Sequence, residues 1–429
     1  MKKLLMLGGS YFQTHAILKA KEMGLYVITC DYLKNNPGHK YSDEYHNIST
    51  TNKEEVLNLA KRLKIDGILA YASDPAAPTA SFVAQHLGLN GLHYKSVEIL
   101  TNKALFREFL HKNGFHAPKG ISFCDLQDGL EKMQDLTFPL ILKPVDSSGS
   151  KGVYKINCKD DLKKYFSKAM QYSLSKKVIL EEWINYDGFQ IAGDGFSIDG
   201  KLIFCGFANE HFNTKSKSPF VPICESFPYI GDEKTKNMLR DEIQKVLNLL
   251  DLKTGSYNFD IRIKDNKVYF LEIGPRNGGN LIPQTIHLAY GVDLVDAQIR
   301  AALGMDLQKL KDEIKNSTLN GYFACYVLHS NKSGIYEGLE IDKDFKPNIQ
   351  SLQIFINIGD KISHFSGSNA TIGIVIFKSS SIQSMHKNIK NMQNLIKIKM
   401  GGGSLSYKNL RILFIIYCPL LSYTKECVA

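Results

Sequence analysis

The sequence lacks several features that would assign it to familiar classes of protein. Its eight cysteines include no pair two or three residues apart, so neither a zinc knuckle nor a CxxC redox motif is present. The longest apolar run, Ile412 to Leu421, has ten residues, against the ~20 that span a bilayer. Leu4 to Leu7 are too few apolar residues for the core of a signal peptide. These absences predict a protein of the reducing cytoplasm with no membrane partner.

Positive charge is in excess but is not concentrated. The net charge is +10, with 53 basic residues scattered among 43 acidic ones. A nucleic-acid-binding protein is expected to carry a basic stripe, so that class is disfavoured. The pattern favours a mildly basic enzyme surface that suits anionic ligands. With 429 residues, 44% of them hydrophobic, the chain is long enough for two or three globular domains.

The first ninety residues alternate between apolar strands and helical segments. Strands are indicated at 3–9, 25–32 and 66–72, and helices at 11–24 and 54–63. This alternation predicts a parallel sheet with right-handed crossovers. Gly8-Gly9 closes the first strand, but the later glycines of the dinucleotide fingerprint GxGxxG are missing. A glycine-rich turn that faces some ligand is therefore favoured over NAD binding.

A second motif, at residues 195–202, resembles a P-loop only in part. The sequence GFSIDGKL matches the pattern up to its lysine, but Leu202 stands where Ser or Thr should bind magnesium. Apolar and polar residues alternate on both sides of Asp199-Gly200, which predicts a β-hairpin. Before it, a helix is indicated from about Leu100 to Asn113.

Two carboxylates lie on the strands of another predicted hairpin, which turns at Asp265-Asn266. Asp260 lies five residues before Asp265 and Glu272 six after Asn266, so the two should be roughly level. Glu272 belongs to the apolar run VYFLEI, where an unpaired buried carboxylate would be costly. Two facing carboxylates can share Mg²⁺, which takes oxygen ligands and leaves positions for substrate phosphates.

Lysines and a glycine loop precede that hairpin in the sequence. Lys143 ends an apolar strand, and SSGSKG follows at residues 147–152 as a flexible flap. Backbone N–H groups of such loops can turn toward phosphate oxygens. Each feature is common by itself. The informative signal is their order: Lys103, Lys143, the flap, the acidic strand ILEEWI, then the hairpin with Asp and Glu.

This order of motifs resembles that of the ATP-grasp superfamily. Within the superfamily it is most similar to biotin carboxylase, the halves of carbamoyl-phosphate synthetase and ATP-dependent amino-acid ligases. The resemblance covers about residues 3–400. It implies an α/β and α+β fold in four segments: a Rossmann-like pre-ATP-grasp domain at 1–95, a two-subdomain ATP-grasp domain at 96–305, a small C-terminal α+β domain at 306–400, and an appended tail at 401–429 without an assigned role.

The resemblance also implies which residues bind the nucleotide. Those at the phosphates would be Lys103, Lys143, Ser148, Gly149, Lys151 and Gly152. Glu181 would lie near the exocyclic amine of adenine. The backbone around Glu182, Trp183 and Ile184 would read the edge of the ring.

Asp260 and Glu272 would be the magnesium ligands by the same resemblance. Arg276 and Asn280 would be the catalytic residues, with Arg276 holding the carboxylate and the developing acyl phosphate. Two positions depart from the family pattern. Gly274 replaces an asparagine that is a further metal ligand in many members, so a second Mg²⁺ would depend on Asn277 or Asn280. Gln190 replaces a ribose-binding glutamate but can still hydrogen-bond hydroxyls.

The function that the resemblance implies is that of an ATP-dependent ligase. A carboxylate would be phosphorylated and then attacked by an amine, or by a thiol, with ATP and Mg²⁺, or Mn²⁺ in its place, as cofactors. Two alternatives stay open: a carboxylase-type subunit acting on bicarbonate, and a nucleotide-binding protein without turnover. The chain has no biotin-acceptor Met-Lys-Met segment, which disfavours a fused carboxylase. The expected partners are a small-molecule carboxylate and amine, without nucleic acid or membrane, and a homodimer is the candidate assembly.

Overall fold

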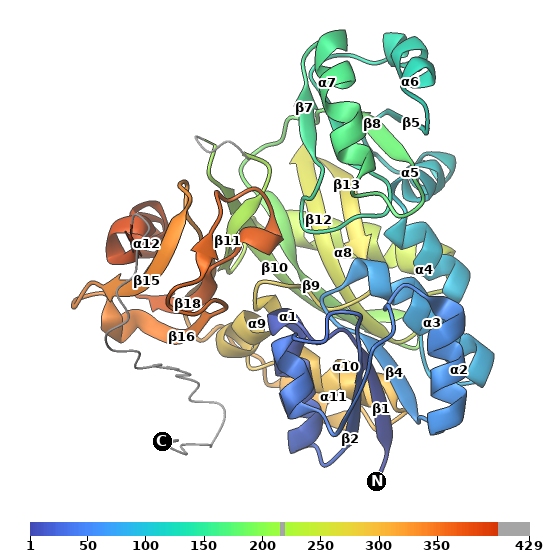
Figure 1. The fold of residues 1–429 in the computed structure, drawn as a ribbon, viewed down its shortest axis with the longest axis vertical. Helices are drawn as coiled ribbons and strands as arrows, with labels where there is room; N and C mark the ends of the chain where they lie inside the picture. Colours follow the sequence, from blue (N-terminus) through green and yellow to red (C-terminus); the bar gives the residue numbers. More distant parts are fainter. Residues whose placement is uncertain (215–218, 402–429) are drawn as a thin grey trace. The chain divides into compact units, whose positions relative to one another are not determined.

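The computed structural model describes residues 1–214 and 219–401, which separate into two compact units (Figure 1). The first unit combines Met1–His211 with Phe227–Asn320, and the second combines Phe212–Ser226 with the described residues from Gly321 onward. Every residue predicted for the functional site belongs to the first unit. The predicted tail lies, from residue 402, outside the described residues. The predicted segment boundaries at 95 and 305 stay predictions.

The N-terminal sheet of the first unit is parallel, with strand order β3–β2–β1–β4. Its strands are β1 (Lys3–Leu7), β2 (Tyr26–Cys30), β3 (Glu44–His46) and β4 (Gly67–Ala70). Leu4 to Leu7 are completely buried, as expected for a parallel strand covered on both faces. The predicted βαβ alternation is confirmed.

Helices cover both faces of that sheet. One face packs against α2 (Lys53–Leu63), α3 (Ala77–Leu87) and α4 (Tyr94–Thr101). The other packs against α1 (Tyr11–Glu22) and α10 (Leu294–Ala302), which returns from much later in the chain. Because α10 follows the predicted catalytic residues Arg276 and Asn280 in the chain, this packing connects that part of the chain to the N-terminal sheet.

A small antiparallel sheet follows, with strand order β5–β8–β6–β7. Its strands are β5 (Gly120–Phe123), β6 (Leu140–Pro144), β7 (Tyr154–Ile156) and β8 (Val178–Glu182), and α6 (Leu126–Lys132) and α7 (Lys159–Met170) pack on it. The helix predicted from Leu100 is two helices. Asn102 separates α4 from α5 (Lys103–Lys112), because its side chain accepts the N–H groups of Ala104 and Leu105 and so begins a new helix.

The first unit also contains a run of antiparallel strands in the order β13–β12–β9–β10. They are β9 (Gln190–Ile198), β10 (Lys201–Phe212), β12 (Gly255–Lys264) and β13 (Lys267–Gly274), with α8 (Glu233–Leu249), α9 (Ile282–Tyr290) and α11 (Gln308–Lys315) as the remaining helices. Asp199 and Gly200 have φ of 50° and 84°, and Asp265 and Asn266 have 50° and 57°. Positive φ at both central residues is typical of tight hairpin turns, and both predicted hairpins are confirmed.

The second unit has its own α+β core. Four of its strands are neighbours in the order β11–β14–β18–β16 within an eight-stranded sheet, and a separate three-stranded sheet has the order β17–β15–β19. The elements are β11 (Pro222–Phe227), β14 (Tyr322–Leu328), β15 (Gly334–Ile341), β16 (Ile349–Ile354), β17 (Lys361–Ile362), β18 (Gly373–Ser379), α12 (Ile382–Leu395) and β19 (Ile396–Gly401). The mixed α/β and α+β class is confirmed. Across the described part of the chain, no helix has the length and apolar character needed to cross a membrane.

Candidate functional site

The two predicted metal ligands face each other across the β12–β13 hairpin. Asp260 is the direct register partner of Glu272, and a bulge follows Asp260. Burial, and then the neighbouring carboxylate of Glu272, raise the pKa of Asp260 to about 7. Two like charges held together in this way suit a divalent cation that takes oxygen ligands. Within residues 1–214 and 219–401 no group of three or more His, Cys, Asp or Glu that could hold a metal ion is found.

Lys103 at the start of α5 joins this hairpin to the flap. Its Nζ lies 3.3 Å from Oε2 of Glu272 and donates a hydrogen bond of 2.8 Å to the carbonyl of Ser147. Its backbone N–H donates to the carbonyl of Val145 at 2.8 Å. The lysine thus contacts a predicted metal ligand and the predicted phosphate flap together.

Lys143, at the end of β6, pairs with the buried carboxylate of Glu181. The same carboxylate pairs with Arg107, a residue that the sequence did not indicate. Oε2 of Glu181 lies 2.6 Å from Nζ of Lys143, and Oε1 lies 2.7 Å from Nε of Arg107. Burial favours the neutral carboxyl, but the charges of Arg107 and Lys143 outweigh it and lower the pKa of Glu181 to about 2. Burial lowers the pKa of Lys143, against the opposite effect of Glu181. The carboxylate predicted to face adenine is therefore held by two cations, and its adenine contact stays a prediction.

The flap between β6 and β7 is anchored by hydrogen bonds at its beginning, whereas its middle contains residues with positive φ. The carboxylate of Asp146 accepts the hydroxyl of Ser173 and the N–H groups of Leu174 and Ser175, at 2.8, 3.0 and 2.7 Å. Gly149, Ser150 and Gly152 all have positive φ, of 65°, 57° and 73°. Glycine adopts this conformation without strain, so the backbone here can take several arrangements. The predicted phosphate contacts of Ser148, Gly149, Lys151 and Gly152 remain untested.

The predicted adenine strand ends beside an arginine that sequence reasoning missed. Arg262 on β12 lies between the rings of Trp183 and Tyr186, with its Cζ 4.1 and 4.5 Å from their centroids. It donates to the carbonyl of Ile184 and to Oε1 of Gln190, both at 2.8 Å. The available signal was a single arginine inside the apolar alternation FDIRI.

Gln190 and Glu182 are also held in place. The amide nitrogen of Gln190 donates to Oε2 of Glu210 at 2.5 Å, and these two residues are direct register partners on β9 and β10. A carboxylate thus lies next to the glutamine that replaces the ribose-binding glutamate. The carboxylate of Glu182 accepts the N–H of Thr137 at 2.9 Å, and the backbone N–H of Trp183 donates to Pro139 at 3.0 Å.

The guanidinium of Arg276 is buried in an ion pair with Asp74. Burial opposes the charge, but Asp74 outweighs it, so the pKa of Arg276 is raised further. Asp74 opens the short 3₁₀ turn Asp74–Ala76 that follows β4, 202 residues before Arg276. A Cβ at Gly274 would lie 2.7 Å from Oδ1 of Asp74 and 3.0 Å from Cζ of Arg276. The carboxylate of Asp74 therefore occupies the space into which an asparagine at 274 would project.

The loop after β13 is held by another buried carboxylate, Asp194. It accepts the N–H of Gly278 at 2.7 Å and the side-chain amide of Asn258 at 2.9 Å. Burial raises its pKa to about 7. Asn277 is completely buried and donates to the carbonyl of Leu294 at 3.4 Å. Asn280 lies at the end of the loop with φ of 53°, and its predicted catalytic role is untested.

A family model described as "ATP-grasp domain" matches residues 136–284. The matched segment contains Lys143, the flap, the acidic strand β8, the β12–β13 hairpin and Arg276. The chain contains an ATP-grasp domain.

Two enzymes resemble this chain along more than half of its length. The formate-dependent phosphoribosylglycinamide formyltransferase of Prochlorococcus marinus (strain MIT 9515) is 25% identical over 350 residues, which are 80% of this chain and 86% of that protein. The carbamoyl phosphate synthase large chain of Thermoanaerobacter pseudethanolicus is 26% identical over 263 residues, which are 60% of this chain and only 24% of the larger protein.

Solved structures share the fold. An L-amino acid ligase from Bacillus licheniformis has a TM-score of 0.79 at 20% identity, covering 94% of this chain and 99% of the ligase. The biotin carboxylase domain of the Hydrogenobacter thermophilus 2-oxoglutarate carboxylase has a TM-score of 0.70 at 16% identity, covering 93% of this chain and 91% of that domain. These likenesses show that the chain has the fold of these enzymes. The ATP-grasp match and the sequence relatives support an enzyme of the ligase type.

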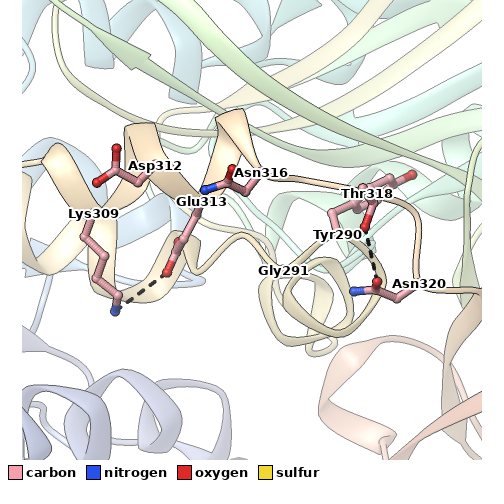
Figure 2. Close-up of a pocket in the computed structure, with 8 residues that line it drawn as sticks. All are labelled: Tyr290, Gly291, Lys309, Asp312, Glu313, Asn316, Thr318 and Asn320. Atoms are coloured by element: carbon pink, nitrogen blue, oxygen red, sulfur yellow. Dashed lines mark hydrogen bonds and ion pairs between the residues drawn. The ribbon is translucent and has the colours of Figure 1, made fainter.

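A cavity of about 670 Å³ lies away from the ATP-grasp site. It is formed by the end of α9, by α11 and by the segment that follows α11 (Figure 2). Its lining residues are Tyr290, Gly291, Lys309, Asp312, Glu313, Asn316, Thr318 and Asn320. Lys309 points toward Glu313, 3.8 Å away, and Asn320 toward Thr318, so these side chains bond to one another across the lining. None of the predicted site residues contributes to it.

Proposed function

We propose that this enzyme activates a small-molecule carboxylate as an acyl phosphate for attack by an amine, with release of ADP and phosphate. The observation that carries the proposal is a convergence of charges in the first unit. Lys103 contacts Glu272, Glu272 faces Asp260, and the charges of Lys103 and Arg276 act on Asp260. Cations that can bind phosphates thus meet a carboxylate pair that can bind a metal.

The residues divide into those for the nucleotide and those for the reaction. Asp260 and Glu272 would hold Mg²⁺, which when bound neutralises charge on the phosphates. Lys103 and Lys143 would bind phosphate oxygens, and the flap would exclude water. Trp183 and Ile184 would lie along the edge of adenine.

Arg276 would act on the reacting groups. The substrate carboxylate oxygen attacks the terminal phosphorus of ATP, and the bond from that phosphorus to ADP breaks. The amine nitrogen then attacks the acyl carbon, phosphate leaves as the carbonyl re-forms, and the nitrogen gives up one proton, which the leaving phosphate can take. A buried guanidinium is suited to the charge that develops on the carboxylate and on the phosphoryl group, because it is preorganised and does not titrate.

A carboxylase-type reaction on bicarbonate is the second candidate. It is favoured by the biotin carboxylase domain with a TM-score of 0.70, whose structure contains MgADP and bicarbonate. That domain is also described as a dimer. This supports a homodimer as the assembly we propose for this chain, and light scattering would test it.

An ADP- and phosphate-release screen tests the proposal. The enzyme is supplied with MgATP and pairs of amino acids or small acids with amines, and in a separate arm with bicarbonate; mass spectrometry identifies the product. We expect release only with a carboxylate and an amine together, and none with Lys143→Ala. Lys245→Ala, on an exposed face of α8, is the matched control. Release with bicarbonate alone would favour the carboxylase reaction, and binding of ATP without any release would favour a protein without turnover.

A further inference from the structure

Two basic residues one turn apart on α5 bind acids from different strands. Lys103 pairs with Glu272 of β13 at 3.3 Å, and Arg107 lies 2.7 Å from Glu181 of β8. Residues separated by four positions lie on the same face of a helix, so both side chains leave α5 in the same direction. Arg107 also donates from Nη2 to the carbonyl of Leu271, just before Glu272, at 2.7 Å. It therefore contacts both the small sheet and the strand of the predicted metal ligand.

The buried carboxylate of Glu181 is stable in its charged form only while a cation is paired with it. It is 1% exposed, and a buried carboxylate without a partner is strongly unfavourable. It has two partners, Arg107 at Oε1 and Lys143 at Oε2. If Lys143 were its sole partner, any movement of Lys143 toward a nucleotide phosphate would leave a buried charge unpaired.

Two nitrogens of the Arg107 guanidinium make no hydrogen bond within the described part of the chain. Its Nε and Nη1 are buried without a hydrogen-bond partner among the described residues, and so is Oε1 of Glu181. The 2.7 Å contact is thus ionic, because the N–H does not point along it. A small rotation of the carboxylate would align the Nε–H with Oε1 and bring Oε2 to the second N–H of Nη2, which gives the two parallel bonds that a guanidinium forms side-on with a carboxylate.

We propose that Arg107 is a positioning residue that keeps Glu181 paired while Lys143 moves to a phosphate oxygen of a nucleoside di- or triphosphate. This rests on the proposed function in one respect, the binding of nucleotide at Lys143. Lysine cannot replace Arg107, because a single ammonium cannot hold the carbonyl of Leu271 and fork onto Glu181 together. Arg107 touches no nucleotide atom in this proposal and acts through Lys143.

Nucleotide binding without turnover tests it, so the substrate need not be known. Trp183 is the only tryptophan of the chain and lies on the predicted adenine strand, so its fluorescence reports binding. Affinities for MgADP and for adenosine are measured for the wild type, Arg107→Met and Arg107→Gln. Arg240→Met, whose side chain is 42% exposed on α8, is the control. Because adenosine lacks the phosphates of MgADP but has the same base, the ratio of the two affinities reports the phosphate contacts. A change in the adenine contacts affects both affinities and cancels in the ratio.

The preference of the wild type for MgADP over adenosine should fall by roughly tenfold or more in Arg107→Met, the scale expected when one hydrogen bond to a charged group is removed. The adenosine affinity and the control should not change. The decisive variant is Arg107→Met with Glu181→Gln, which removes the charge that would retain Lys143. The preference for MgADP should return in this double variant, an outcome that a merely structural role of Arg107 does not predict.

Two results would overturn the proposal. One is an unchanged preference in both Arg107→Met and Arg107→Gln; the other is a double variant that binds MgADP no better than Arg107→Met. A wild type that binds neither ligand would instead overturn the proposed function, and the inference with it. If Arg107→Met does not fold, Arg107→Gln carries the comparison with and without Glu181→Gln.

Discussion

At the scale of single residues, Arg276 has the surroundings that matter most for the candidate site. Its guanidinium is buried against Asp74, and Gly274 is the residue that leaves room for this pair. The glycine at 274 is therefore explained by sterics: the carboxylate of Asp74, from the turn after β4, fills the space that an asparagine side chain would need.

The steric role of Gly274 predicts a large effect of one methyl group. Gly274→Ala should reduce the free energy of unfolding by about 1–3 kcal/mol, because buried Asp74 and Arg276 cannot both move aside. Gly279→Ala is the matched control, since a Cβ there meets nothing within 4 Å. Urea unfolding of both variants is the measurement. Equal stability of Gly274→Ala and the wild type would contradict the steric explanation.

The catalytic assignment of this loop predicts a separation of binding from turnover. Arg276→Ala should retain ATP affinity and lose roughly 10²–10³-fold in turnover, or about 3–4 kcal/mol, because one preorganised charge-stabilising donor is removed. Glu272→Gln should instead weaken the dependence on magnesium. ADP release and nucleotide affinity are measured for both variants once the substrate pair is known.

Because Arg276→Ala leaves Asp74 unpaired, its folding must be checked by urea unfolding. Arg276→Lys should rescue turnover only in part, since a point charge does not reproduce a planar fork. Normal turnover of Arg276→Ala would show that the assignment of this loop is wrong.

Asp194 predicts a pH dependence of stability. Burial raises its pKa to about 7, above the ~3.9 of an unfolded chain. The folded state binds more protons than the unfolded state between these values, so this group's contribution to stability falls as pH rises from about 4 to 7. Asp194→Asn cannot titrate.

The free energy of unfolding of Asp194→Asn, relative to the wild type, should therefore increase across that interval, by at most about 4 kcal/mol. Urea unfolding at pH 4.5 and 7.5 measures the difference. The same difference at both values of pH would show that Asp194 does not titrate in this range.

At the scale of elements, the flap between β6 and β7 is the segment whose backbone dihedral angles allow more than one conformation. Its start is fixed through Asp146, whereas Gly149, Ser150 and Gly152 have positive φ. Lys103 is its link to α5, through the carbonyl of Ser147. A nucleotide that engages Lys103 would therefore act on the flap as well.

Limited proteolysis tests the flap. Trypsin should cleave after Lys151, and a non-hydrolysable ATP analogue with magnesium should suppress that cleavage, because phosphate oxygens would order the loop. Cleavage after Lys201, which is exposed at the start of β10, is an internal control for protease activity. Equal cleavage at Lys151 with and without the analogue would count against the assignment.

At the scale of the whole molecule, the chain contains two units with separate hydrophobic cores. All candidate nucleotide residues belong to the first unit. The core of the second is formed by its own strands β14, β16 and β18 with α12. Ligand binding and the stability of the second unit should therefore be experimentally separable.

Hydrogen exchange tests this separation. MgADP should slow exchange in β6, β8, β12 and β13 of the first unit by shifting their opening equilibria, and should leave β14 and β18 unchanged. Adenosine should protect β8 while leaving the flap unprotected. Protection that is as strong in β14 as in β13 would mean that the nucleotide acts on the second unit too.

The sequence by itself determined those parts of the site that depend on local geometry. Asp260 and Glu272 could be placed opposite each other because a tight turn and the two-residue period of strands fix the register of a hairpin. Lys143 and the flap could be placed because a strand end followed by glycines is also a local signal.

Only the tertiary structure decided the partners of these residues. Asp74 and Arg276 are 202 positions apart, and Arg107 and the carbonyl of Leu271 are 164 apart. Such pairs form because α5 and α10 pack against the ATP-grasp strands and the turn after β4 meets the loop after β13, and no periodicity in the sequence records that packing. The same reason explains why Glu181 lies between two cations: its orientation depends on α5, a helix in another part of the chain.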